Sequence, residues 1–260
     1  MKVINLSSGS DGNLTYFESA SARILVDDGL SCAETQRRLS LLGVDGGDID
    51  AIVVTHEHSD HTKGINVFAK KYNIPVYAHV EVWPGLEDKL TRIPDENRKV
   101  FTDAFAIKDL IIEPVELPHD VKCFGFSVKE GEKKVSILTD LGHATDKIFN
   151  AVKGSTLVYI EANHDINMLK NCTKYPLTLK MRIAGPKGHL SNDASADFIE
   201  RLVTSGTKQI VLAHLSKENN SPEFAYNYIC EKLEQNGLVE GQGFKIDVAT
   251  TRPTTMFNLK

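Results

Sequence analysis

The stretch His56-Glu-His-Ser-Asp-His61 follows directly after the apolar run Ala51-Ile-Val-Val-Thr55. The apolar run is typical of a buried β-strand, so the polar stretch stands where a strand ends. Its three histidines and one aspartate offer the nitrogen and oxygen donors that hold zinc, manganese or iron. The first two histidines can point the same way because side chains alternate along an extended segment, while the last two donors lie past the turn and can face a second ion. The stretch therefore predicts the start of two adjacent metal sites, with ligands His56, His58, Asp60 and His61.

Composition limits the classes of protein to consider. The chain has 260 residues, 41% of them hydrophobic and 25% charged, which is ordinary for a globular protein able to bury a sizeable core. The net charge of −5 means that any binding of nucleic acid must come from a local basic patch. The sequence has no apolar run long enough for a membrane span. Its polar start predicts a first strand rather than a signal peptide. The four cysteines lack CxxC spacing and are typical of reduced thiols, so we expect a cytoplasmic location.

Strand and helix patterns alternate along the whole chain. The expected strands after the first are Asn13–Ser19, Arg23–Val26, Ala51–Thr55, Val76–Ala78, Ile111–Leu117, Phe124–Lys129, Val135–Thr139, Leu157–Ile160, Gln209–Ala213 and Lys245–Ala249. The expected helices are one with a capping box at Ser31 and Glu34 that stops at Gly43, one capped by Asn192 that runs through Leu202, and one from Ser221-Pro222 to Gly237. This mixture favours α/β layers in a single domain over residues 1–260, against a helix bundle or an all-β sandwich.

A short internal repeat links the two halves of the chain. Ile24-Leu-Val-Asp-Asp-Gly29 and Ile137-Leu-Thr-Asp-Leu-Gly142 share four of six residues, and each follows a hairpin-like stretch. Further along, each is followed by an apolar strand that ends in histidine and acidic residues. The repeat predicts two similar strand-rich halves that deliver polar groups to one shared edge.

Three more candidate ligands stand where strands stop. They are His119, Asp140 and His214, which follow the strands ending near Leu117, Thr139 and Ala213. In open α/β sheets, ligands gather outside strand ends. Together with the opening stretch these residues make seven donors, the number that two neighbouring ions need when a bridging position stays open. A carboxylate such as Asp140 has two oxygens and can bridge the ions.

A glycine-rich loop, Gly185-Pro-Lys-Gly-His-Leu-Ser191, leads into the helix expected at Asn192. Glycine loops and helix N-termini present backbone N–H groups to anions. Lys187 lies in this loop, with Lys180 and Arg182 just upstream, so the segment indicates a phosphate-binding patch in an otherwise acidic chain. His189 can act there as a general acid or hold a phosphoryl oxygen.

The remaining polar candidates are less specific. His79 is expected to be structural or exposed. His143 and His164 follow the two strands of the second half and can support the ligands or contact the substrate. Asp27 can orient a ligand histidine through its second ring nitrogen.

The order HxHxDH, a later histidine, a strand-end aspartate and a final strand-end histidine resembles the metallo-β-lactamase fold superfamily, over roughly Val3 to Val248. The resemblance implies a four-layer αβ/βα sandwich built from two pseudo-equivalent halves. It also implies one metal on His56, His58 and His119 and a second on Asp60, His61 and His214. Asp140 would bridge the two, with a water or hydroxide between them.

By this resemblance, Asp60 corresponds to the acidic residue that the HxHxDH motif carries in the hydrolytic branch of the superfamily. Gly188-His-Leu-Ser-Asn192 and Leu212-Ala-His-Leu-Ser216 resemble the phosphodiesterase branch, in which a histidine like His189 serves at the scissile phosphate. Four segments resemble the bacterial YycJ (WalJ) type, a group regarded as DNA exonuclease-like: Ser7–Asn13, Glu161–Asp165, Tyr175–Ile183 and His214–Asn220. The chain departs from the large nucleases in having no room for a β-CASP insertion, and it shows no long tRNA-gripping arm, which argues against tRNA processing.

The sequence thus predicts a dinuclear metal-dependent phosphodiesterase, most simply a DNA exonuclease-like hydrolase that uses a metal-bridging hydroxide, with His189 and Asp60 as catalytic residues. The two divalent ions are zinc or manganese, and iron is also compatible with these donors. One alternative is a small-molecule hydrolase of cyclic phosphodiesters, lactones or thioesters. An apolar pocket with no use for Lys180 and Arg182 would favour it. The full ligand set argues against a second alternative, a non-catalytic metal-bound regulator.

Overall fold

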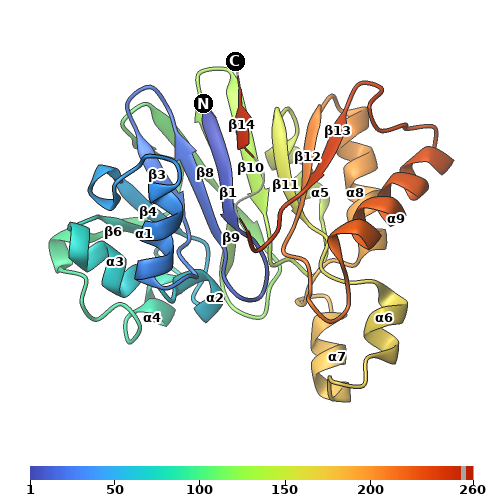
Figure 1. Cartoon of the computed structure of the whole chain (residues 1–260), viewed down its shortest axis with the longest axis horizontal. Coiled ribbons are helices and arrows are strands. Elements are labelled where there is room, and N and C mark those ends of the chain that lie inside the picture. Colours follow the sequence, from blue (N-terminus) through green and yellow to red (C-terminus); the bar gives the residue numbers. More distant parts are fainter. Residues whose placement is uncertain (253–255, 260) are drawn as a thin grey trace.

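Two sheets face each other in the computed structural model, which describes residues 1–252 and 256–259 (Figure 1). In the described residues the first sheet has seven strands in the order β14-β1-β2-β3-β4-β5-β6. Neighbouring strands from β14 to β3 are antiparallel, and those from β3 to β6 are parallel. The strands are β1 (Lys2–Ser7), β2 (Leu14–Glu18), β3 (Arg23–Val26), β4 (Ala51–Val54), β5 (Val76–His79), β6 (Arg98–Phe101) and β14 (Met256–Asn258).

The second sheet has the order β13-β12-β11-β10-β9-β8-β7 and the same plan. Its strands are antiparallel from β7 to β10 and parallel from β10 to β13. They are β7 (Phe105–Ile107), β8 (Leu110–Leu117), β9 (Cys123–Glu130), β10 (Lys133–Leu138), β11 (Leu157–Glu161), β12 (Gln209–Ala213) and β13 (Lys245–Val248). The two copies of the repeated sequence begin within β3 and β10 and continue into the loops that follow. In each sheet this strand is the one where the pairing changes from antiparallel to parallel. The predicted relation between the two halves is therefore confirmed.

Helices cover the outer faces of both sheets, so the predicted four-layer αβ/βα sandwich is confirmed (Figure 1). On the first sheet lie α1 (Cys32–Ser40), α3 (Ile65–Tyr72) and α4 (Trp83–Leu86), and on the second lie α5 (Asp146–Val152), α8 (Asn192–Thr204) and α9 (Pro222–Gln235). The short helices α2 (Ser59–Thr62), α6 (Ile166–Asn171) and α7 (Leu177–Ile183) stand at one end of the sandwich. Two 3-10 turns, Gly46–Asp48 and Asp95–Asn97, lie in the first half of the chain. Within the described residues no helix combines the length and hydropathy needed to cross a membrane.

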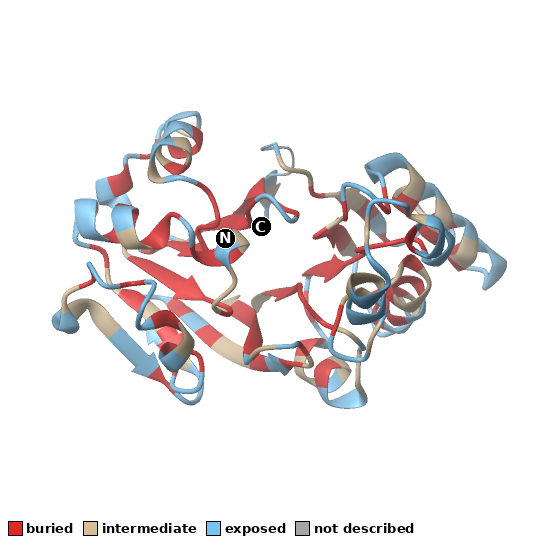
Figure 2. Ribbon diagram, turned by 90° about the horizontal axis from the view of Figure 1, so that it is seen from below, coloured by how far each residue is buried: buried red, intermediate tan, exposed pale blue. Residues whose placement is uncertain are grey.

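The largest core cluster fills the space between the sheets and extends to the helices that cover the first sheet. Figure 2 shows buried residues along the strands of both sheets. Phe17 and Leu25 of the first sheet and Phe126 and Tyr159 of the second belong to this cluster, and all four are buried. A second cluster packs β10–β12 against the outer helices α5, α8 and α9. Because β11 is covered on both faces, every one of its residues is buried. Because these strands are buried, they fix the positions of the predicted ligands that follow their ends.

One predicted helix start is wrong by one residue. Ser191, not Asn192, caps α8, because its hydroxyl accepts a hydrogen bond from the backbone N–H of Ala194. Asn192 is the first helical residue, and its buried side-chain amide pairs with that of Asn220. Asn192 and Ser191 are both good capping residues, and the long-range contact with Asn220 decides between them.

Candidate metal centre

The seven predicted donors come together at the end of the sandwich where α2 lies. His56 follows β4, and His58, Asp60 and His61 lie on or beside α2. The other three donors follow the ends of β8, β10 and β12. In the described part of the chain, the groups whose donor atoms lie within 4.8 Å of one another include His56, His58 and His119, and Asp60, His61 and His214. The remaining acidic residue of the stretch, Glu57, points elsewhere, with its carboxylate 3.9 Å from Lys89.

Asp140 lies between these two groups. One carboxylate oxygen is 3.1 Å from His61 Nε2, and the other is 3.9 Å from His119 Nε2. Asp140 also forms a third group of potential ligands with His56 and His61. It is almost fully buried, so its two oxygens are directed into the site and not to solvent.

Backbone strain marks the same strand ends. Asp27, Asp140 and His214 adopt φ values of 60°, 65° and 55°, a left-handed conformation that is uncommon for residues other than glycine. Asp27 and Asp140 follow the equivalent strands β3 and β10, and His214 follows β12. Strained residues of this kind persist where the surrounding structure fixes them, and they cluster at functional sites.

Three of the imidazoles are fixed through Nδ1, which donates to an oxygen acceptor. His61 donates to Asp27 at 2.7 Å, and His214 donates to Glu161 at 2.7 Å. His119 donates to the carbonyl oxygen of Gly188 at 3.2 Å. In metal sites such hydrogen bonds fix the ring orientation and leave Nε2 for the metal.

The donor set fits divalent cations. His56 Nε2 is buried and has no hydrogen-bond partner among the described residues. Within that same part of the chain, the buried atoms Asp140 Oδ2 and His214 Nε2 have only contacts with other predicted donors, at 3.1 Å from His61 and 3.5 Å from Asp60. Buried polar atoms are rarely left unpaired because their desolvation is costly. Burial alone would lower the pKa of His61, but the carboxylates of Asp140 and Asp27 outweigh it and raise that pKa to about 10. The carboxylates therefore stabilise positive charge at this point of the site.

Glu161, which the sequence reasoning missed as a site residue, links two functional histidines. It ends β11 and is fully buried. Its Oε1 accepts hydrogen bonds from His189 Nδ1 at 2.9 Å and His214 Nδ1 at 2.7 Å, and its Oε2 accepts from the backbone of Leu141 and Leu190. Burial raises the pKa of Glu161, but the two imidazoles and these hydrogen bonds outweigh it and lower that pKa to about 2. Glu161 is therefore a carboxylate at neutral pH.

Two further residues at the site were not anticipated. Asp120 lies 3.3 Å from His58 Nε2 and 3.2 Å from His119 Nε2, and its other oxygen pairs with Arg182 at 2.8 Å. The side-chain amide of Asn13 lies 2.9 Å from His61 Nε2, and its backbone N–H donates to the Asp60 carbonyl. A signal was present for Asp120, which follows His119 directly after a strand.

His189 lies at the edge of the centre. Its ring centroid is 5.3 Å from those of His119 and His214, and its side chain is more exposed than theirs. Burial lowers the pKa of His189, but the Glu161 carboxylate and Asp140 outweigh it, so the net shift is upward. The protonated form of His189 is therefore favoured.

The other predicted polar residues are distributed around this centre. His143 is exposed, and its Nδ1 lies 2.8 Å from the carbonyl of Pro186 in the glycine-rich loop. Lys187 lines a cavity of about 310 Å³ beside His119. His79 is buried outside the centre and stacks on Phe124 at 4.0 Å, which agrees with a structural role.

Lys180 and His164 belong to a neighbouring part of the molecule. The Lys180 ammonium donates to the carbonyl of Lys170, joining α7 to α6. His164 is buried and lines an apolar pocket between these helices.

Residues 22–215 match the beta-lactamase superfamily domain, so the chain belongs to this superfamily. The fold and the cluster of histidines and aspartates agree with that assignment and define a metal-dependent hydrolase. The metallo-β-lactamase fold protein YhfI from Bacillus subtilis superposes with a TM-score of 0.71 over 98% of both chains, at 16% identity.

Curated relatives place the chain more narrowly. It is 35% identical over 253 residues to "Exodeoxyribonuclease YycJ" of Bacillus anthracis, covering 96% of each chain. It is 36% identical over 248 residues to "Exodeoxyribonuclease WalJ" of Streptococcus pneumoniae, covering 93% of this chain and 91% of the relative. Within the superfamily the chain is therefore of the YycJ type.

Proposed function

We propose that this protein is a dinuclear metal-dependent phosphodiesterase that degrades DNA from its ends, and that residues 1–260 act as one domain. The position of Asp140 is the observation that supports two metal ions. One of its oxygens lies near His61 of one donor group, and the other lies toward His119 of the second. The exodeoxyribonuclease names of the relatives support DNA as the substrate class.

In this proposal His56, His58 and His119 would hold one ion, and Asp60, His61 and His214 would hold the other. Asp140, whose oxygens lie toward both groups, would serve as a ligand of both. Two divalent ions supply Lewis-acid polarisation of a phosphoryl oxygen and lower the pKa of water. Zinc and manganese both suit imidazole and carboxylate donors. Asp27, Glu161 and the Gly188 carbonyl keep the imidazoles oriented through the Nδ1 contacts described above.

His189 is proposed to donate a proton to the leaving oxygen and to stabilise the negative charge that develops on the phosphoryl group. Its Nδ1 donates to Glu161, so the ring is held in one orientation. Against the effect of burial, the adjacent carboxylates of Glu161 and Asp140 raise the pKa of His189 and so favour the protonated form that can donate. Removing such a group typically lowers the rate by about 10²–10³.

Asp60 is proposed to act in catalysis as well as in metal binding. Its Oδ2 lies 3.5 Å from His214 Nε2 and 3.6 Å from His61 Nε2 and is partly accessible. A partly accessible carboxylate at this position can accept the proton of the attacking water. The basic residues Arg182 and Lys187, beside Asp120 and His119, are proposed to contact the phosphates of the DNA backbone.

The direct test is degradation of end-labelled single-stranded and double-stranded DNA by protein loaded separately with zinc and manganese. A covalently closed circle of the same sequence serves as a substrate without ends. We expect release of labelled products from linear DNA, loss of this activity in Asp60→Ala, and retention in Glu57→Ala, a matched change in the same stretch. Cleavage of the circle would contradict end-directed action, and no cleavage with either metal would contradict the proposal.

One observation supports the alternative of a small-molecule hydrolase, namely the apolar pocket between α6 and α7. However, Lys180 lines that pocket and Arg182 contacts Asp120 at the centre, so both cations belong to the surroundings of the site. Charge reversal of Lys180 and Arg182 separates the two functions. A nuclease loses affinity and salt dependence, whereas a hydrolase of small esters is little affected.

A further inference from the structure

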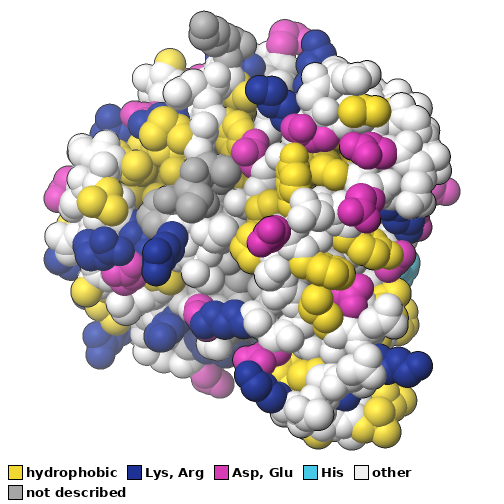
Figure 3. Space-filling model, turned by 45° about the vertical axis from the view of Figure 1, so that its right-hand side comes forward, with side chains coloured by type: hydrophobic (Ala, Val, Ile, Leu, Met, Phe, Trp, Pro, Cys, Tyr) yellow, Lys and Arg dark blue, Asp and Glu magenta, His cyan; other side chains and the backbone are white. Residues whose placement is uncertain are grey.

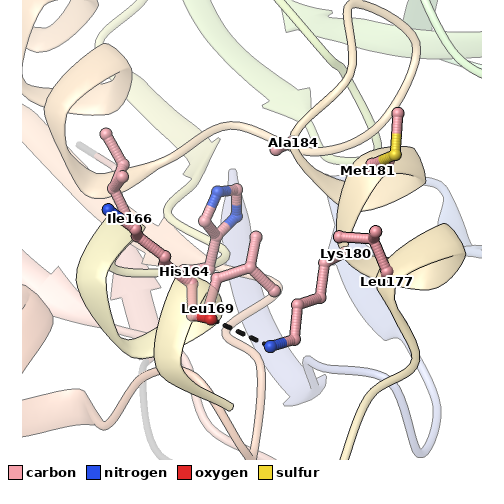
Figure 4. Close-up of a pocket in the computed structure, with 8 residues that line it drawn as sticks. His164, Ile166, Leu169, Leu177, Lys180, Met181 and Ala184 are labelled. Atoms are coloured by element: carbon pink, nitrogen blue, oxygen red, sulfur yellow. Dashed lines mark hydrogen bonds between the residues drawn. The ribbon is translucent and has the colours of Figure 1, made fainter.

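A pocket of about 300 Å³ opens between α6 and α7, the pair of short helices that projects from the end of the sandwich (Figures 1 and 4). Its lining is mostly apolar: His164, Ile166, Leu169, Lys170, Leu177, Lys180, Met181 and Ala184. Leu177 and Met181 on α7 are 72% and 66% exposed, although large apolar side chains usually find cover. The pocket therefore presents an unusually apolar surface to an incoming molecule.

One polar group interrupts the apolar lining. His164 is almost fully buried, and its Nδ1 has no hydrogen-bond partner among the described residues. Figure 4 shows its ring between the side chains of α6 and those of α7. Burial lowers the pKa of His164 to about 4, so the ring is neutral at pH 7 and offers one donor and one acceptor. An entirely apolar occupant would leave this buried group unpaired, which is unfavourable.

Two lysines, Lys170 and Lys180, line the pocket, and Lys187 lies in the glycine-rich loop that follows α7. Among the described residues, the ammonium groups of Lys170, Lys180 and Lys187 have no acidic partner within 4 Å, and the Lys180 group instead donates to the Lys170 carbonyl. Figure 3 shows hydrophobic side chains next to Lys and Arg on the lower right of the surface, where α6 and α7 lie. An apolar slot with cations beside it suits a group that is flat and apolar on its faces and attached to an anionic backbone.

Backbone hydrogen bonds connect the walls of the pocket to the loop that carries His189. The backbone N–H of His189 donates to the carbonyl of Ile183, the last residue of α7. On the other side, His164 lies three residues beyond Glu161, and its carbonyl accepts from the N–H of Asn192. A group seated between α6 and α7 is thus next to the loop that carries His189.

From this arrangement we propose that the pocket between α6 and α7 receives a nucleobase from the end of the substrate strand, with His164 hydrogen-bonding the edge of the base. The inference rests on the proposed function. Leu177 and Met181 contact the faces of the base, and Lys170 and Lys187 face the flanking phosphates. Enzymes that act on nucleic acids commonly read an unstacked base in this way, by apolar contact on its faces and hydrogen bonds at its edge.

The test compares two single-stranded oligonucleotides of equal length, one normal throughout and one with abasic residues at both ends. With the metal-loaded wild-type protein we expect kcat/KM to be about tenfold higher for the normal strand, mainly through KM, because the abasic strand lacks the group that the pocket would bind. Met181→Ser should bring the two values close together. Leu41→Ser is the matched control, because Leu41 is also 66% exposed and lies just after α1 on the other sheet, and it should keep the tenfold preference.

A simple phosphodiester without a base is measured in parallel. If it is hydrolysed while the two oligonucleotides are cleaved equally, the pocket assignment is overturned and the proposed function stands. If neither it nor DNA is hydrolysed, the proposed function fails and the assignment fails with it. Equal cleavage, together with a wild-type dimer that Met181→Ser converts to a monomer, would assign the surface to a second copy of the chain and overturn the proposal.

Discussion

Replacing Glu161 with glutamine tests whether this one buried carboxylate stabilises the fold around the metal centre and orients its histidines. Four N–H groups converge on its two oxygens, two from the imidazoles of His189 and His214 and two from the backbone of Leu141 and Leu190. Glutamine has the same shape but only one acceptor oxygen. In either orientation of the amide, its NH₂ group faces two of these donors, and two hydrogen bonds are lost.

The magnitude follows from these contacts. A hydrogen bond to a charged group contributes about 1.5–3 kcal/mol. The loss of two therefore predicts a decrease of about 3–6 kcal/mol in the free energy of unfolding at neutral pH. Because His214 also loses the acceptor that fixes its ring, we expect zinc affinity to fall by about 10–100-fold.

The assay is urea unfolding of the metal-free protein, followed by zinc titration of the folded protein. Glu113→Gln is the control, since Glu113 on β8 forms a partly exposed ion pair with Lys129 at 2.6 Å. Exposed pairs contribute about 0–1 kcal/mol. If Glu161→Gln lowers stability and zinc affinity no more than Glu113→Gln does, the four hydrogen bonds to Glu161 do not hold the centre in place.

Three further predictions concern single residues. Burial lowers the pKa of His164 from 6.5 to about 4. The stability that the neutral, buried ring contributes is therefore fully present above pH 6.5, and it is lost as the pH falls toward 4. In urea unfolding between pH 6.5 and 4, the free energy of unfolding should fall by about 3 kcal/mol more for wild type than for His164→Asn. The same pH dependence in both proteins would contradict this. In Gly29→Ala a Cβ would overlap the Asp60 carbonyl, so we expect a loss of about 3 kcal/mol or more, against about 1 kcal/mol for Gly154→Ala, where the space is open. In His189→Ala we expect unchanged metal content and turnover lower by about 10²–10³, and loss of metal would instead make His189 a ligand.

Much of the fold could be predicted because its signals are local. The apolar strands carry short-range patterns, and the dense donor stretch at His56–His61 stands at the end of one of them. The repeated Ile-Leu-x-Asp segments indicated two related halves, and β3 and β10 occupy the same place in their sheets. These features depend on a few neighbouring residues, so periodicity and motif spacing are sufficient to find them.

Glu161, Asp120 and Asn13 were missed because their roles depend on long-range contacts. Glu161 lies 28 and 53 residues from its two histidine partners, and Asn13 lies 48 residues from His61. A signal for Glu161 existed: an acidic residue ends β11, which lies between two strands that both lead to predicted ligands. The sequence did not show that this carboxylate is buried and shared by two imidazoles.

The α6–α7 pair was also not predicted from pattern. Helices α6 and α7 have only six and seven residues, which is too few for a helical spacing of apolar residues to be recognised. No side chain caps the N-terminus of α7 among the described residues. The Lys180–Arg182 segment was therefore read only as a basic patch. In the structure Lys180 joins the two helices and Arg182 pairs with Asp120, so these cations also position the projecting pair beside the metal centre.

Seven donors arranged around Asp140 are proposed to hold two divalent ions. Native mass spectrometry of the protein after dialysis against zinc or manganese tests this proposal most directly, by counting bound ions per chain. We expect two ions for wild type and weakened binding of both in Asp140→Ala, because its oxygens lie toward both donor groups. A single ion in saturated wild type would contradict a dinuclear site, and two firmly held ions in Asp140→Ala would contradict a role of Asp140 toward both ions.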